Sequence, residues 1–119
     1  MGYILIEKKA VIEPNPFKWA AWMETANRVV EQTVVGNGVK VSTVFLGLDH
    51  SISYEEEPIL FETMIFGGHR DGETYRYTTW EFAKFGHDKI IKEFTERCSY
   101  CGTLRLADNI NCVKCGAPF

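Results

Sequence analysis

The chain has 119 residues, of which 45% are hydrophobic and 13% aromatic, and this composition excludes an intrinsically disordered protein. Its formal net charge is −3, with 12 acidic against 7 basic residues over 1–83 and 4 against 6 over 84–119. Such an acidic body disfavours wrapping of a nucleic-acid backbone, because that binding depends on neutralised phosphates. No window approaches the roughly 18 apolar residues of a membrane span.

The first nine residues, MGYILIEKK, lack the basic leader and the long apolar run of a signal peptide. We therefore expect a cytoplasmic protein without membrane contact. A helix is predicted from residue 16 to about residue 28. Asn15 is a good N-cap and Pro16 suits the first helical position, and Trp19, Met23 and Ala26 then recur at helical spacing.

Four strands are predicted after this helix. β-branched residues dominate 29–35 and 39–48, and Gly36-Asn37-Gly38 between them is a strong hairpin turn. Residues 58–66 are predicted to form a further buried strand that ends at two glycines. Residues 73–77 alternate in character and should pair back on it.

A second helix is predicted to begin at a T-x-x-E capping box over 78–81 and to run to about residue 95. His87 lies on its apolar stripe, and we interpret it as a hydrogen-bonded core residue. The order and the short connections predict an α+β body over 1–96, in which a small antiparallel β-meander is covered by two helices. The apolar stripe comprises Trp80, Ala83, His87, Ile90, Ile91 and Phe94.

All four cysteines lie near the end of the sequence as C-x2-C-x10-C-x2-C: Cys98, Cys101, Cys112 and Cys115. Two residues between thiolates let one turn direct both sulfurs at a point, and two such turns form a tetrahedral site that zinc most often fills. The sequence therefore predicts a zinc ribbon over 97–119 with one structural zinc ion. Four thiolates complete the coordination shell, so no position remains for substrate or a reactive water.

Other interpretations of the cysteines are weaker. Disulfides require an oxidising compartment, for which the sequence gives no sign. A redox C-x-x-C pair normally opens a helix beside a βαβ unit, and neither pair does so. Iron stays open as the alternative metal, because four cysteines at this spacing do not distinguish it from zinc.

Several residues of the body could carry chemistry. Asp49, His50, Glu62 and His69 lie in or directly after predicted strands, where adjacent strands can bring such residues together to bind a metal or exchange protons. Their spacing matches no known metal or nucleophile motif, and Asp and His are common at loop tips. No residue is therefore assigned as catalytic, and the four remain a hypothetical functional cluster.

Tyr75 and Tyr77 flank Arg76 on the short strand predicted at 73–77. Alternating aromatic residues of this kind can stack nucleic-acid bases. A base-stacking sheet normally adds surrounding lysines and arginines, which are sparse here. We favour packing in the core or at the sheet edge for both tyrosines.

Three stretches carry a resemblance to a known family: 41–50 (VSTVFLGLDH), 60–68 (LFETMIFGG) and 77–81 (YTTWE), followed by Gly86-His87. They resemble a family of small uncharacterised proteins encoded by bacteriophages and prophages. The segment CVKCGAP over 112–118 is separately similar to zinc ribbons of the CxxCG…CxxCGAP type. The phage resemblance implies an intracellular protein of an infected bacterium, and it implies no activity or substrate.

Three functions follow as hypotheses. The favoured one is a non-enzymatic, zinc-binding interaction protein that binds a host or phage macromolecule, in the first place a protein, and modulates a host process or defence. The second is a nucleic-acid-associated factor that uses the zinc ribbon. The third is a small enzyme that uses the cluster of Asp49, His50, Glu62 and His69. The sequence does not indicate an oligomeric state.

Overall fold

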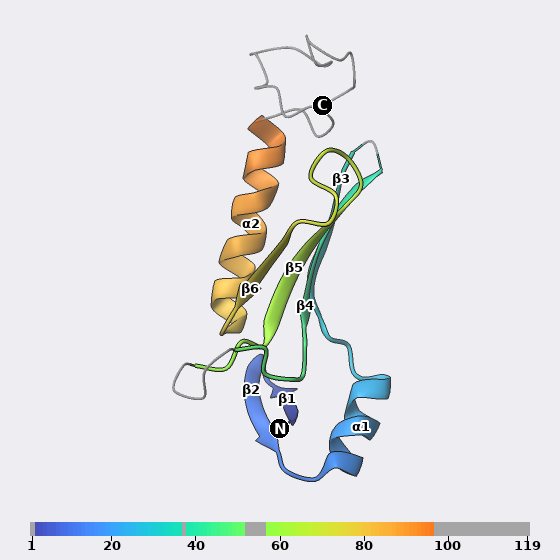
Figure 1. Cartoon of the computed structure of the whole chain (residues 1–119), viewed down its shortest axis with the longest axis vertical. Coiled ribbons are helices and arrows are strands. Elements are labelled where there is room, and N and C mark those ends of the chain that lie inside the picture. Colours follow the sequence, from blue (N-terminus) through green and yellow to red (C-terminus); the bar gives the residue numbers. More distant parts are fainter. Residues whose placement is uncertain (1, 37, 52–56, 97–119) are drawn as a thin grey trace.

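A computed structural model describes residues 2–36, 38–51 and 57–96 of the chain, and these form an α+β fold of two antiparallel sheets and two helices. Figure 1 shows helix α2 lying along the larger sheet. The smaller sheet and helix α1 lie together at one end of this sheet, at the bottom of the view. The elements in chain order are β1 (Gly2–Ile6), β2 (Lys9–Glu13), α1 (Pro16–Thr25), β3 (Val29–Gly36), β4 (Val39–Phe45), β5 (Phe61–Phe66), β6 (Thr74–Tyr77) and α2 (Trp80–Glu96).

The larger sheet is the predicted antiparallel meander, with strand order β3-β4-β5-β6. Gly36 and Gly38 both have positive φ at the turn between β3 and β4, the conformation for which glycine is favoured there. Val41 of β4 lies opposite both Thr33 of β3 and Ile65 of β5, which places three buried or half-buried side chains in one row across the sheet.

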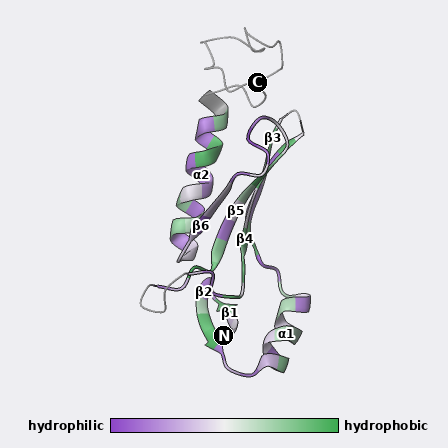
Figure 2. Ribbon diagram, in the orientation of Figure 1, coloured by the Kyte–Doolittle hydropathy of each residue, from purple (hydrophilic) through white to green (hydrophobic). Residues whose placement is uncertain are grey.

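Helix α2 covers one face of this sheet, and its contacts extend over all four strands. The alternation of side chains along β4 and β5 directs one set of residues at the helix. Figure 2 shows hydrophobic and hydrophilic residues alternating along α2, as an amphipathic helix requires. The buried apolar core consists of Val39, Val41, Phe45, Leu60, Phe61, Ile65, Ala83, Ile90 and Phe94.

Helix α1 does not cover the meander, so the prediction of two covering helices is wrong. It packs on β1 and β2 and buries none of its residues completely. Only its Trp22 reaches the larger core, where the ring meets Phe45 edge-on at 5.7 Å between centroids. The indole Nε1 of Trp19 donates a hydrogen bond of 3.1 Å to the Gly47 carbonyl, which ties α1 to the loop after β4.

The hairpin of β1 and β2 was not predicted. Its two-residue turn consists of Glu7 and Lys8, which adopt positive φ values of 50° and 70° although neither is Gly, Asn or Asp. The usual hairpin sequence signal is therefore missing. This hairpin joins the rest of the body through Tyr3, whose backbone N–H donates a 2.8 Å hydrogen bond to the Gly47 carbonyl.

The boundaries of the predicted elements also need correction. Helix α1 ends at Thr25 rather than near residue 28, and strand β4 ends at Phe45 because Gly47, with a φ of 80°, turns the chain. At the start of α2 the capping side chain is Thr79, whose Oγ1 accepts from the Phe82 N–H at 3.1 Å. The cap is thus one residue later than the predicted box.

In the part of the chain that the structure describes, neither helix is both long enough and apolar enough to cross a membrane. The predicted ribbon over 97–119 lies outside the described residues.

Candidate functional site

A groove of about 470 Å³ runs between strand β6 and helix α2, at the edge of the larger sheet. We call it the β6–α2 groove. Its volume lies within the range of about 300–1,000 Å³ that is typical of ligand sites. It is lined by Ile59, Tyr75, Arg76, Tyr77, Thr78, Phe82, Phe85, Gly86, Lys89, Ile90 and Glu93.

The floor of the groove follows from the register of β5 and β6. Tyr75 pairs with Thr63 and Tyr77 with Phe61, and both β5 partners are fully buried beneath α2. Because paired residues direct their side chains to the same face, both tyrosines point toward the helix. Tyr77 is half-buried at the sheet edge, in agreement with the expected packing, whereas Tyr75 is exposed.

Gly86 allows helix and strand to approach closely beside the groove. A Cβ atom at this position would overlap the ring and hydroxyl of Tyr77. A glycine inside a helix costs about 1 kcal/mol relative to alanine, and contact with Tyr77 accounts for its presence in the middle of α2.

The outer wall of the groove is apolar and exposed. Phe82 and Phe85 of α2 are 61% and 71% exposed, although α2 directs its other large apolar residues inward. Sequence analysis did not select these two residues, since they lie off the core-facing stripe. Their spacing could have identified them, because two phenylalanines three residues apart outside that stripe form a second apolar patch on the helix.

The charges around the groove are mostly neutralised by neighbours. Arg76 forms an ion pair of 3.0 Å with Glu62, and Glu93 forms one of 3.1 Å with Arg70. Lys89 is exposed and makes no ion pair with any described residue. The groove therefore presents aromatic surface and one available cation.

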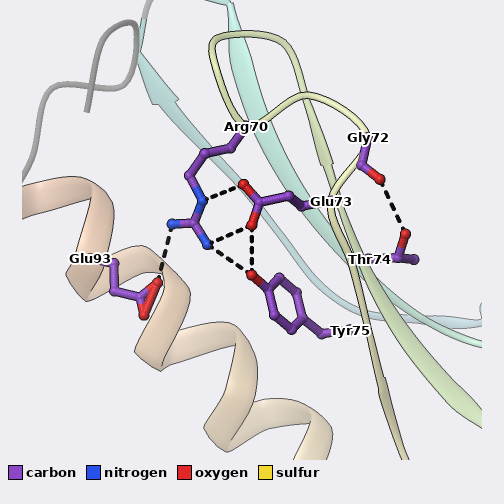
Figure 3. Close-up of polar contacts among 6 residues, drawn as sticks. All are labelled: Arg70, Gly72, Glu73, Thr74, Tyr75 and Glu93. Carbon is purple, nitrogen blue, oxygen red and sulfur yellow. Dashed lines mark hydrogen bonds and ion pairs between the residues drawn. The ribbon is translucent and has the colours of Figure 1, made fainter.

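A polar network fixes one end of the groove (Figure 3). The Arg70 guanidinium, in the loop after β5, donates to Glu73 at 2.9 Å, to Glu93 at 3.1 Å and to the Tyr75 hydroxyl at 3.1 Å. It also lies 5.0 Å from the ring centroid of Phe94. The hydrogen bonds from Arg70 and then from Tyr75 lower the pKa of Glu73. This network joins the loop, β6 and α2, and holds the Tyr75 ring in place.

His87 is completely buried between α2 and the sheet, as predicted for a core histidine. Its Nδ1 lies 2.8 Å from the Thr43 hydroxyl and its Nε2 lies 2.9 Å from the Thr33 hydroxyl. The Thr63 hydroxyl is in turn hydrogen-bonded to Thr43. Burial lowers the pKa of His87, although Glu31 lies 3.7 Å from Nε2. A neutral, fully enclosed imidazole has a structural role and no access to substrate.

The structure does not bring the hypothetical cluster into one site. Asp49 and His50 follow the last residue of β4, whereas His69 follows the last residue of β5. Since these strands are antiparallel, the two loops lie at opposite ends of the sheet (Figure 1). Glu62 lies near the first of these ends and is paired with Arg76 on the sheet face opposite α2.

Asp49 has a local structural role. Its carboxylate accepts hydrogen bonds from the backbone N–H groups of Ser51 at 2.8 Å and of Ile59 at 2.9 Å, which connects both ends of the loop between β4 and β5. The hydrogen bond from Ser51 N–H is the main reason why the pKa of Asp49 is lowered. Within residues 2–36, 38–51 and 57–96, no group of three or more His, Cys, Asp or Glu residues is placed to hold a metal ion.

The predicted zinc ligands Cys98, Cys101, Cys112 and Cys115 lie outside the described residues. Comparison of the chain with protein-family models, with curated proteins and with solved structures finds no match.

Proposed function

We propose that this chain is a small, non-enzymatic interaction protein that binds a protein partner through the β6–α2 groove. The observation that carries the proposal is the exposure of Phe82 and Phe85 beside a groove floored by Tyr75 and Tyr77. Binding energy at protein interfaces is concentrated in aromatic anchors that sit in or beside such pockets. The phage resemblance favours a host or phage protein of the bacterial cytoplasm as the partner.

A binding role agrees with the hydrogen bonding of the polar side chains in the body. The polar networks around Arg70 and around His87 are internally hydrogen-bonded and hold secondary-structure elements together. No buried side-chain nitrogen or oxygen among the described residues lacks a hydrogen-bond partner. Among the described residues that line the groove, Lys89 is the one cation without an ion pair, which is less than a phosphate backbone requires.

The proposal includes one structural zinc ion bound by Cys98, Cys101, Cys112 and Cys115. The donor set supports it, because four thiolates in two C-x-x-C turns suit a closed tetrahedral zinc site. Zinc bound in this way stabilises the fold of its own segment and leaves no open coordination position. Purified protein should contain one equivalent of zinc by elemental analysis.

Removal of the metal should affect the two parts of the chain differently. A chelator or mild acid should release zinc and unfold residues 97–119, because the ligands bind as thiolates. The body should stay folded, since every fully buried apolar residue that the structure describes lies within residues 39–94. Circular dichroism during zinc release tests this, and loss of the whole fold in one step would contradict it.

The groove is tested by site-specific crosslinking in cells that produce the protein. A photoreactive phenylalanine analogue at Phe85 should give one discrete protein adduct, because this side chain is exposed at the groove. The matched control is the same analogue at Phe17, which is 85% exposed on α1 and does not line the groove. Adducts from Phe17 alone, or equal adducts from both positions, would contradict the proposed site.

The crosslinked partner, once identified by mass spectrometry and purified, provides the quantitative test. The double substitution Phe82→Ala and Phe85→Ala should weaken its binding at least about 10-fold, as expected when central aromatic anchors are truncated. Phe17→Ala should leave the affinity unchanged. Equal affinity of the groove variant and the wild type would show that the partner binds elsewhere.

A further inference from the structure

The two edge strands of the larger sheet differ in how they are protected. Strand β3 has two register shifts, between Val29 and Glu31 and between Val34 and Gly36. Such bulges twist an edge and discourage pairing with another chain. Strand β6 pairs with β5 in one continuous register from Tyr77 to Thr74. The β6 edge therefore lacks the bulges that the other edge has.

The hydrogen bonds of β6 show which backbone groups face outward. The Glu73 carbonyl accepts from the Ile65 N–H at 3.0 Å, and the Tyr77 carbonyl accepts from the Leu60 N–H at 3.1 Å. Backbone groups of successive residues in a strand point to alternate sides. Residues 73, 75 and 77 thus face β5, and the N–H and C=O groups of Thr74 and Arg76 point away from the sheet.

The groove lies beside this edge, on the face that α2 covers. In an added strand, every second side chain would point to that same face. Those side chains would lie between Tyr75 on one side and Phe82 and Phe85 on the other. The groove volume of about 470 Å³ is sufficient for apolar side chains at alternate positions.

The charged residues that line the groove indicate which residue types the added segment should contain. Arg76 is paired with Glu62, and Glu93 is paired with Arg70, so neither charge is available to a ligand. Lys89 lines the same groove and has no described ion partner. An acidic side chain near Lys89 would find a complementary charge.

From these observations we propose that the partner supplies an extended segment that adds to β6 as a fifth strand. Its backbone bonds to Thr74 and Arg76, its alternate apolar side chains occupy the β6–α2 groove, and an acidic residue meets Lys89. Strand addition to an open sheet edge beside a groove is an established mode of peptide recognition. This inference rests on the proposed function and specifies the form of the partner.

The probe is a series of capped octapeptides in which Val or Phe alternates with Thr. In each peptide one Thr is replaced by Asp, at a different position from one peptide to the next. The peptides are titrated into the full-length, isotopically labelled protein and followed by nuclear magnetic resonance. At least one peptide should bind saturably, and the amide protons of Thr74 and Arg76 should then exchange with solvent at least about 10-fold more slowly. Amides of the β3 edge, such as Gln32, should be unaffected.

Two sets of variants separate strand addition from simple apolar contact. Two peptides are compared, one N-methylated at its odd-numbered amides and one at its even-numbered amides. One of them should lose binding and the other should keep it, because only one set of amides faces β6. Replacing the peptide's Asp by Asn should weaken binding several-fold, and this loss should disappear in Lys89→Ala. Lys18→Ala, which removes an exposed lysine of α1, should retain the loss.

The outcomes distinguish this inference from the proposed function. If no peptide binds below about 1 mM, or if N-methylation has no effect in either set of amides, strand addition is wrong. The groove itself would still stand if Phe82→Ala with Phe85→Ala weakens the crosslinked partner. If that double variant also binds the partner normally, both proposals fail together.

Discussion

The two helices of this protein are nearly opposite in how they use their apolar residues. Helix α2 buries Ala83, His87, Ile90 and Phe94 against the sheet and exposes Phe82 and Phe85 at the β6–α2 groove. Helix α1 buries no residue completely, and its Phe17 is 85% exposed. The comparison shows that one helix can form both a layer of the core and the wall of a binding groove. The other helix serves mainly to brace the N-terminal hairpin.

Truncation of one apolar residue in each helix tests this difference between the helices most directly. Ile90→Ala in α2 should lower the free energy of unfolding by about 2–5 kcal/mol, because it leaves a cavity beside Val41 and Ile65. Met23→Ala in α1 should cost clearly less, since Met23 is only half-buried and lies against Gly47. Urea denaturation of both variants measures this, and equal losses would show that α1 shares the main core.

The buried histidine of α2 should make stability depend on pH. Because burial lowers the pKa of His87, the folded protein disfavours its charged form. The contribution of neutral His87 to the free energy of unfolding is fully present above the unfolded-state pKa of about 6.5. It is lost progressively as the pH falls below that value. Glu31, Lys84 and Asp88 are the charged groups around it, and Lys84 is hydrogen-bonded to both carboxylates.

His87→Gln should lower the free energy of unfolding at pH 8 by about 1–3 kcal/mol, because the threonine hydroxyls lose a well-placed partner. It should also flatten the dependence of stability on pH between about 6.5 and 5, above the range in which ordinary carboxylates titrate. The control is His50→Gln, which changes an exposed imidazole. Urea midpoints across this range measure both effects, and an unchanged slope in His87→Gln would contradict the assignment.

The close approach of α2 and β6 can be tested at Gly86. Gly86→Ala alone should destabilise the protein, because the new methyl group would overlap the Tyr77 ring. In a Tyr77→Ala background the same change should stabilise it by about 1 kcal/mol, the ordinary helical preference of alanine over glycine. A double-mutant cycle by thermal or urea unfolding gives the sign in each background, and the same sign in both would refute the contact.

The smallest effect is expected at the groove wall. Phe85→Ala should change the free energy of unfolding by less than about 0.5 kcal/mol, as is usual for exposed positions. Phe17→Ala should change it equally little, so these two variants should differ in partner binding and not in stability. A large loss from Phe85→Ala would mean that this ring supports the fold instead.

Much of the meander and of helix α2 was predictable, because β-branched runs, the Gly-Asn-Gly turn and the apolar stripe all indicate the same arrangement. Burial of His87 followed from its place on that stripe. The role of α1 was not predictable, since its apolar spacing indicates a helix but not which sheet that helix contacts. The hairpin turn at Glu7 and Lys8 carries no turn signal at all.

The groove could be predicted only in part. Tyr75 and Tyr77 are recognisable from their alternation, but their facing toward α2 depends on the register with Thr63 and Phe61. The residues of the hypothetical cluster are not brought together, because the ends of consecutive strands in a meander lie at opposite ends of the sheet. Asp49 and His69 were therefore bound to lie apart once the strands were antiparallel.

The chain of hydroxyls around His87 has a consequence for how α2 settles on the sheet. Apolar contacts have no direction, and a shift of α2 by one turn would put Ala83 or Ile91 in the place of His87, beside Thr43 and Thr33. The Thr43 hydroxyl would then keep only its hydrogen bond to Thr63, and the Thr33 hydroxyl would lose its imidazole partner, at a cost of about 1 kcal/mol for each hydrogen bond lost. A single imidazole thus selects one docking position of the helix, and with it the spacing between Phe85 and the β6 edge.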